Sequence, residues 1–125
     1  MRLLLDTTFG IDFLRYDPAA LRRFERAFED GDEPYVNEVV VCELAVGVED
    51  DDPGLAAFLR AVAFVQPPPS AALRAGTWRR AAHRQGRRLS LSDALIAAAA
   101  ESIEAPVVTR NAGDFALTPV RVETY

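Results

Sequence analysis

Lysine is absent from this chain, and cysteine and histidine occur once each. The single cysteine, Cys42, excludes an internal disulfide and any metal cluster built on cysteines. The single histidine, His83, lies on the arginine-bearing side of a predicted helix. We therefore expect His83 at the surface or near a substrate rather than as a metal ligand.

Long hydrophobic runs are missing as well. The apolar run that opens the chain is too short for a signal peptide. The alanine-rich run after Asp93 ends at Glu101 and Glu104, too soon to span a bilayer. These absences predict a cytoplasmic protein with no membrane segment.

The 125 residues, half of them hydrophobic, suit one domain over residues 1–125 with a single core. Short apolar runs predict strands at Leu3–Asp6, around Tyr35, at Val107–Thr109 and at Val120–Val122. Periodicity and end signals predict helices over Thr8–Tyr16, Pro18–Glu29, Glu38–Val48, Pro53–Val65, Ser70–Gly86 and from Ser90 or Ser92 to Glu104. Strands separated by helical crossovers indicate an α/β fold of three layers, α/β/α, with a short, mainly parallel central sheet.

Four carboxylates stand where a globular chain should bury apolar side chains: Asp6, Glu43, Asp93 and Asp114. Asp6 and Asp114 follow predicted strands, and ligands of open α/β sheets collect beyond the carboxyl ends of strands. Glu43 lies on a helix face with apolar neighbours, and Asp93 lies in the first turn of a helix, where the dipole favours an anion. We interpret the four as one site that a divalent cation keeps ionised.

Each acid also has an ordinary structural explanation. Asp6 could cap the following helix, Asp93 could complete a capping box with Ser90, Asp114 could form a turn, and Glu43 could point to solvent. For Asp93 taken alone, capping is the better explanation. Taken together, however, these explanations require four independent coincidences at strand ends and helix faces.

Oxygen ligands without histidine or cysteine favour Mg²⁺ or Mn²⁺ over zinc. Two such ions roughly 3.5 to 4 Å apart activate a water and stabilise both oxygens of an in-line phosphodiester displacement. One ion at rest is equally compatible with the four acids. Hydrolysis of a nucleic-acid backbone is the natural chemistry of such a site.

Basic residues are concentrated between Pro53 and Ser92, where there are seven arginines and no acid. This segment carries a charge of +7, so the rest of a chain of net charge −5 carries −12. Arg80, Arg84 and Arg87 share one helix face, which indicates either a solvated surface or contact with RNA phosphates. Trp78 lies on the opposite face and is predicted to be core.

Four segments resemble, in order and spacing, the motifs of the PIN domain: Asp6-Thr7-Thr8, Glu43-Leu44-Ala45-Val46-Gly47, Asp93-Ala94-Leu95-Ile96 and Thr109-Arg110-Asn111-Ala112-Gly113-Asp114. The likeness covers nearly the whole chain. In its length and its lack of appended domains, the chain resembles the VapC toxins of type II toxin-antitoxin systems.

This resemblance implies a Mg²⁺- or Mn²⁺-dependent endoribonuclease in which Asp6, Glu43, Asp93 and Asp114 are the acidic quartet. It implies that Thr8, Thr109 and Asn111 orient the acids or the attacking water. It also implies a homodimer and a VapB-type antitoxin that inserts a C-terminal segment near the acids. Nothing in the spacing alone shows either partner.

Three alternatives remain open. A Mg²⁺-dependent phosphatase or phosphotransfer domain also places acids at strand ends, but these proteins normally rely on a lysine. A catalytically weak PIN-like binding module has no need to keep four costly acids. A hydrolase built on Cys42 and His83 is remote, because Cys42 is predicted to pack in the core.

Overall fold

The computed structural model describes all residues, 1–125. Its elements in chain order are β1 (Arg2–Leu5), α1 (Thr7–Leu14), α2 (Pro18–Glu29), β2 (Glu33–Asn37), α3 (Glu38–Val46), α4 (Pro53–Ala61), β3 (Ala63–Val65), α5 (Pro69–Arg84), α6 (Leu91–Ser102), β4 (Val107–Val108), the 3₁₀ helix η1 (Ala112–Phe115) and β5 (Val122–Glu123). None of these helices combines the length and the hydropathy needed to cross a membrane.

The five strands form one sheet in the order β3-β2-β1-β4-β5, and every neighbouring pair is parallel. The chain fills one half of the sheet from β1 to β3 and then returns through α5 and α6 to place β4 on the other side of β1. The order of strands therefore reverses between β1 and β4. At such a reversal the helices diverge and leave room for a ligand at the carboxyl ends of the strands.

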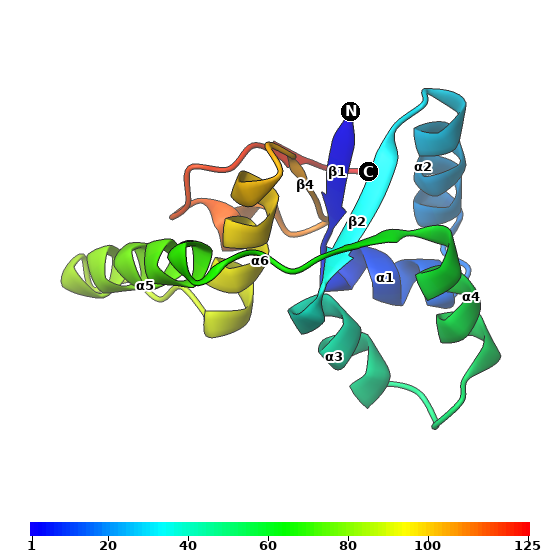
Figure 1. Cartoon of the computed structure of the whole chain (residues 1–125), viewed down its shortest axis with the longest axis horizontal. Coiled ribbons are helices and arrows are strands. Elements are labelled where there is room, and N and C mark those ends of the chain that lie inside the picture. The colour runs from blue at the N-terminus through cyan, green and yellow to red at the C-terminus, as the bar shows by residue number, and fades with distance from the viewer.

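Helices cover both faces of the sheet, as Figure 1 shows with α6 on one side and α2 on the other. The long α5 packs on α6, outside the sheet layer. This arrangement confirms the predicted α/β/α layers, and the sheet is wholly parallel rather than mainly so.

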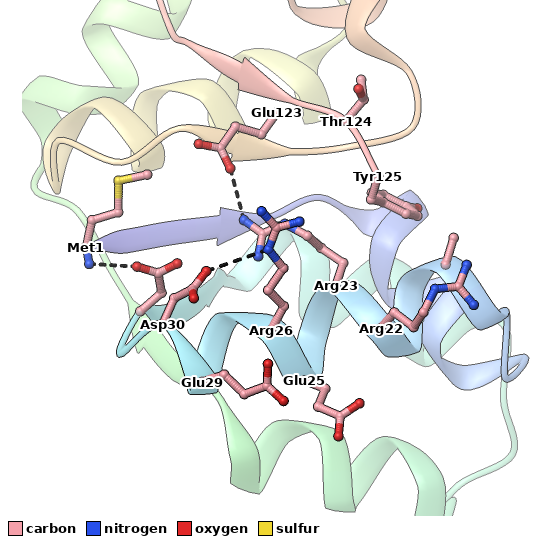
Figure 2. A pocket seen from close by; sticks show the side chains of 12 residues that line it. Met1, Arg22, Arg23, Glu25, Arg26, Glu29, Asp30, Glu123, Thr124 and Tyr125 are labelled. Carbon is pink, nitrogen blue, oxygen red and sulfur yellow. Dashed lines mark hydrogen bonds and ion pairs between the residues drawn. The ribbon is translucent and has the colours of Figure 1, made fainter.

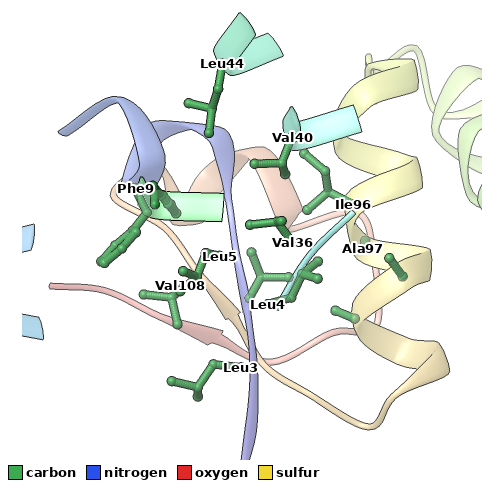
Figure 3. Close-up of a cluster of buried hydrophobic side chains, with 14 of the residues drawn as sticks. Leu3, Leu4, Leu5, Phe9, Val36, Val40, Leu44, Ile96, Ala97 and Val108 are labelled. Atoms are coloured by element: carbon green, nitrogen blue, oxygen red, sulfur yellow. The ribbon is translucent and has the colours of Figure 1, made fainter. Parts of the chain in front are cut away.

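The core lies between the sheet and these helices (Figure 3). Leu3, Leu4 and Leu5 of β1 are at most 2% exposed, because a central parallel strand is covered on both faces. Phe9 of α1 and Ile96 of α6 are fully buried against the same strands. Six buried alanine and leucine side chains form a smaller cluster between α5 and α6, and Trp78 packs half-buried beside it, as predicted.

The predicted helix over Pro53–Val65 is wrong in its last part. The helix ends at Ala61, Val62 is extended, and Ala63–Val65 forms the edge strand β3 beside Tyr35, Val36 and Asn37 of β2. Pairing with β2 gives the backbone N–H and C=O groups of these residues hydrogen-bond partners, and residues such as Phe64 and Val65 favour a strand over a further helical turn. The last strand, predicted at Val120–Val122, is shifted to Val122–Glu123.

Two predictions on α3 are also wrong. Cys42 is exposed rather than packed in the core. Val46, predicted on the buried face of Glu43, is 83% exposed, because α3 ends at that residue and turns away from the core. The buried contacts of α3 come from Val40 and Leu44.

Candidate active site

Asp6 follows β1 and occupies the position before the first turn of α1. Its backbone carbonyl accepts a hydrogen bond from the Gly10 N–H, but its carboxylate makes no capping bond to the second or third residue of the helix. Asp6 therefore occupies the N-cap position of α1 without its side chain serving as the cap. The carboxylate is free to take part in a site at the end of the sheet.

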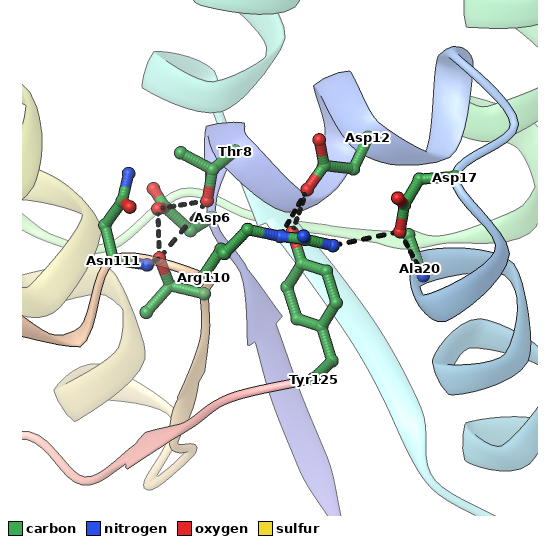
Figure 4. Close-up of polar contacts among 9 residues, drawn as sticks. Asp6, Thr8, Asp12, Asp17, Ala20, Arg110, Asn111 and Tyr125 are labelled. Atoms are coloured by element: carbon green, nitrogen blue, oxygen red, sulfur yellow. Dashed lines mark hydrogen bonds and ion pairs between the residues drawn. The ribbon is translucent and has the colours of Figure 1, made fainter.

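Two hydroxyl groups hold the Asp6 carboxylate (Figure 4). Thr109 donates to Oδ2 at 2.7 Å, Thr8 donates to the same oxygen at 3.1 Å, and the two hydroxyls lie 3.2 Å apart. Asp6 is only 4% exposed, and this burial raises its pKa above the ordinary 3.8. Hydrogen bonds from Thr109, from the Thr7 N–H and from Thr8 oppose the rise in pKa, and the charge of Glu43 adds to it.

Glu43 reaches the same end of the sheet from α3. Thr7, at the start of α1, donates its hydroxyl to Glu43 Oε1 at 2.6 Å. The two helices approach closely because Gly10 faces Leu44, whose Cδ1 would lie 2.7 Å from a Cβ on residue 10. Glu43 is half-buried, so the explanation that it simply points to solvent is wrong.

Asp93 lies in the first turn of α6, and its N–H donates to Ser90 Oγ at 3.1 Å. Ser90 is thus the helix cap. Burial is the largest cause that raises the pKa of Asp93, and hydrogen bonding with Ser90 lowers it. Repulsion from Asp114, Asp6 and Glu43 raises this pKa further. The Asp93 carboxylate therefore lies within electrostatic reach of all three other acids.

Asp114 is exposed on η1, and its N–H donates to the Asn111 carbonyl at 3.0 Å, so the turn foreseen for it does form. Its side chain lines a groove of about 280 Å³ together with Asp93, Arg87 and Arg88. Asn111 is exposed; its N–H donates to Thr109 Oγ1 at 3.0 Å, while its side chain caps no helix. The loop from Thr109 to Asp114 is thereby tied to the Asp6 carboxylate.

The donor chemistry of the four acids fits a hard divalent cation. They offer only oxygen, they come from four elements, and no lysine or histidine neutralises them. No three His, Cys, Asp or Glu side chains are grouped tightly enough to hold a metal ion as they stand. Burial and repulsion that raise the pKa of Asp6 and Asp93 are the costs that a bound cation would offset.

A cavity of about 900 Å³ lies elsewhere, between α2 and the C-terminal segment (Figure 2). It contains none of the predicted site residues. Ion pairs such as Arg23 to Glu123 at 2.9 Å already satisfy much of its charge. The two carboxylates whose pKa burial raises, Asp6 and Asp93, lie outside this cavity, which makes the end of the sheet where Asp6 lies the better candidate site.

The arginine segment forms a second groove next to the acids. Arg79, Arg80, His83, Arg87, Arg88 and Leu89 line about 510 Å³ at the C-terminal end of α5. Arg80 and Arg87 thus lie together as predicted, whereas Arg84 is exposed on the same helix but does not line this groove.

Sequence reasoning missed two features of the site. Thr7 gave no signal apart from its place beside Asp6. Arg110 pairs with Asp12 at 3.0 Å and with Asp17 at 2.9 Å, and its guanidinium lies 4.9 Å from the ring of Tyr125 (Figure 4). Neither contact shows in a local pattern, because the partners lie far apart in the chain.

Known proteins resemble this chain in both sequence and fold. A family model described as PIN domain matches residues 3–119. The chain is 32% identical over 117 residues to ribonuclease VapC19 of Mycobacterium tuberculosis, covering 93% of this chain and 94% of that protein. VapBC2 from Rickettsia felis, bound to a DNA fragment from its promoter, has a TM-score of 0.86 at 20% identity, covering 100% of this chain and 99% of that chain. DNA-bound VapBC from Salmonella typhimurium has a TM-score of 0.83 at 25% identity, covering 99% and 98%.

Proposed function

Because the chain belongs to the PIN-domain family, we propose that it is a Mg²⁺- or Mn²⁺-dependent endoribonuclease and the toxin of a VapBC-type toxin-antitoxin pair. One observation carries the proposal: burial raises the pKa of Asp93, and repulsion from the carboxylates of Asp114, Asp6 and Glu43 raises it further. Acids that repel one another at the reversal of strand order are costly to keep without a cationic ligand. The name of the relative, ribonuclease VapC19, supports RNA as the substrate.

The proposed roles follow from the contacts of each side chain. Asp6 and Asp93 are the principal ligands, and Glu43 and Asp114 complete the oxygen donors. One or two cations bound there would activate water and neutralise charge on the scissile phosphate. Hydrogen bonds from Thr8 and Thr109 fix the orientation of Asp6.

Two further residues position these groups. Thr7 fixes Glu43 through its hydroxyl. Asn111 offers an exposed amide next to the acids, suited to orient the attacking water or a phosphate oxygen.

Cleavage of RNA by the purified protein tests this function. We expect cleavage with Mg²⁺ or Mn²⁺, its loss in EDTA, and a loss of at least about a hundredfold in Glu43→Gln. Glu38→Gln is the matched control, since Glu38 is an exposed acid at the start of the same helix. Asp6→Asn and Asp93→Asn should behave as Glu43→Gln does, with circular dichroism unchanged.

Other results would favour the alternatives. Full cleavage by folded Asp93→Asn protein would contradict the proposed site. Binding of RNA without cleavage in any divalent metal would indicate a binding module. Hydrolysis of a phosphomonoester in place of RNA would indicate a phosphatase.

We also propose a VapB-type antitoxin and a second copy of this chain as partners. The solved structures with the same fold include VapBC complexes from Rickettsia felis and Salmonella typhimurium. Where a small reading frame for a DNA-binding protein adjoins this gene, co-expression of the two should yield a stable complex that no longer cleaves RNA. Light scattering on the chain alone should give the mass of a dimer, and a monomer at all concentrations would contradict the second partner.

A further inference from the structure

The arginines at the end of α5 have no acidic partners. The ion pairs of the molecule use Arg23, Arg26, Arg74, Arg110 and the amino terminus. Arg79, Arg80, Arg87 and Arg88, which line the groove beside the acids, form none. Four cations that crowd one another without a counter-charge are destabilising unless an anion joins them.

The turn after α5 places Arg87 and Arg88 in the wall of this groove, close to the acids. Gly86 ends the helix with a φ of +67°, a conformation that suits glycine, and so turns Arg87 and Arg88 back along the helix. Arg79 donates its Nε–H to the Leu89 carbonyl at 3.1 Å and fixes the far side of the turn. The walls are therefore held by backbone geometry rather than by ion pairs.

The basic groove adjoins the acidic one. Arg87 and Arg88 line both, so a groove of about 510 Å³ that begins at Arg80 lies next to one of about 280 Å³ that holds Asp93 and Asp114, and we call the two together the path. Guanidinium groups match phosphate oxygens with paired hydrogen bonds, which ammonium groups cannot do. The path thus offers phosphate contacts up to the acids and cation ligands at its end.

We propose that this path seats one strand of single-stranded RNA, with Arg87 and Arg88 on the phosphate next to the cleaved bond and Arg79 and Arg80 on the phosphates that follow. The proposal rests on the ribonuclease function proposed above. The arginines follow one another in a run that ends at the acids, an arrangement that suits a single extended backbone. Arg84 lies outside the path.

No Phe, Tyr or Trp side chain lines the path, and His83 is its one aromatic ring. Trp78, on the same helix, is half-buried, with the Arg74 guanidinium 5.3 Å from its ring. Stacking along this stretch is therefore limited to the His83 ring and the guanidinium planes, and phosphate contacts dominate. We expect this stretch to bind RNA with little regard to sequence.

Fluorescence anisotropy in EDTA tests the path without cleavage. The probe is a short fluorescein-labelled 2′-O-methyl RNA, alone or annealed to its complement. We expect Arg87→Gln with Arg88→Gln to weaken single-strand binding at least about tenfold, and to reduce the slope of log affinity against log salt by about 1.4. Arg60→Gln with Arg121→Gln is the matched control: both arginines are exposed and unpaired, lie outside the path, and should change affinity less than about twofold.

The outcomes separate this proposal from the ribonuclease function. Unchanged binding in the folded double variant, or duplex bound as tightly as the single strand, would overturn the path. Cleavage in Mn²⁺ is measured on the same proteins. If the wild type cleaves RNA and the double variant keeps its KM, the path fails and the function stands. If the wild type binds in the path and cleaves nothing, the function fails and the path stands.

Discussion

Thr109 donates its hydroxyl to Asp6 Oδ2 at 2.7 Å, joining residues 103 positions apart in the chain. The contact spans the two central strands, since Thr109 follows β4 and Asp6 follows β1. Both residues are buried. One hydrogen bond thus couples the position of a proposed metal ligand to the pairing of the strands that close the sheet.

Thr109→Val tests this coupling. Valine keeps the shape but removes a donor from Asp6 and an acceptor from the Asn111 N–H, so we expect a loss of about 1–3 kcal/mol in the free energy of unfolding. The pKa of Asp6 should rise further, and the pH at which cleavage begins should rise with it. Thr77→Val is the control, because Thr77 is exposed on α5; its effect should stay within about 0.5 kcal/mol. Identical pH profiles for wild type and Thr109→Val would contradict the role of this hydroxyl.

The raised pKa of Asp6 predicts how stability depends on pH without metal. The folded protein holds the Asp6 proton more tightly than the unfolded chain, so this contribution is fully present below the ordinary pKa of 3.8. It is lost as the pH rises through the higher folded pKa. Asp6→Asn should therefore raise Tm in EDTA at neutral pH by about 3 °C, and by much less at acid pH. A Tm that falls at neutral pH in EDTA would contradict this sign.

Mn²⁺ should reverse the order of stability. A cation that binds the folded wild type alone raises its Tm with concentration, and Asp6→Asn should gain little. Differential scanning calorimetry with and without Mn²⁺ measures both effects. Equal gains in the two proteins would place the cation away from Asp6.

Gly10→Ala should disturb Glu43 from a distance. The new methyl group would meet buried Leu44 at 2.7 Å and push α3 away from α1, at a cost of about 1–3 kcal/mol, offset by up to about 1 kcal/mol of helix propensity. The Thr7 to Glu43 bond should lengthen, and cleavage should fall more than stability does. In Gly76→Ala nothing lies within 4 Å of the new Cβ, so that control should gain about 0.5–1 kcal/mol and keep its activity.

Arg110→Ala should loosen the loop that carries Asn111 and Asp114. Its pairs with Asp12 and Asp17 are about half-exposed, so their loss should cost only about 1 kcal/mol in urea unfolding. The Mn²⁺ concentration for half-maximal cleavage should nevertheless rise about threefold, because Arg110 lies between Thr109 and Asn111. Arg26→Ala removes a looser, more exposed pair at 3.7 Å and should leave both quantities unchanged.

Local patterns were sufficient for much of the fold. Pro18 and Gly31 bracket α2 because proline suits a first turn and Gly31 adopts a φ of +75°. Asn37, directly before the predicted helix, caps α3 through a bond from the Val40 N–H at 3.1 Å. In contrast, β3 could not be predicted from its own residues, because only its pairing with β2 distinguishes it from a helix end.

The candidate site, too, has residues that local sequence could indicate and residues that it could not. The four acids could be recognised because each conflicts with its apolar surroundings, which is a property of neighbouring residues. Of the side chains that hold them, Thr8 and Thr109 were expected only from the family resemblance, and they contact Asp6. Thr7 was not expected, because it meets Glu43 across 36 positions of the chain. The exposure of Cys42 was missed for a related reason: hydrophobic periodicity on α3 does not reveal which face the sheet leaves open.

The reversal of strand order between β1 and β4 has a consequence for synthesis on the ribosome. Asp6 and Glu43 leave the ribosome early, but Asp93 and Asp114 emerge only with the last third of the chain. The parallel partner of β1 on this side, β4, is translated after α6, so the end of the sheet cannot close until translation is nearly finished. A nascent chain that ends before Asp93 therefore carries only two of the four proposed ligands, and the proposed site cannot assemble until the segment from Asp93 to Asp114 has been made.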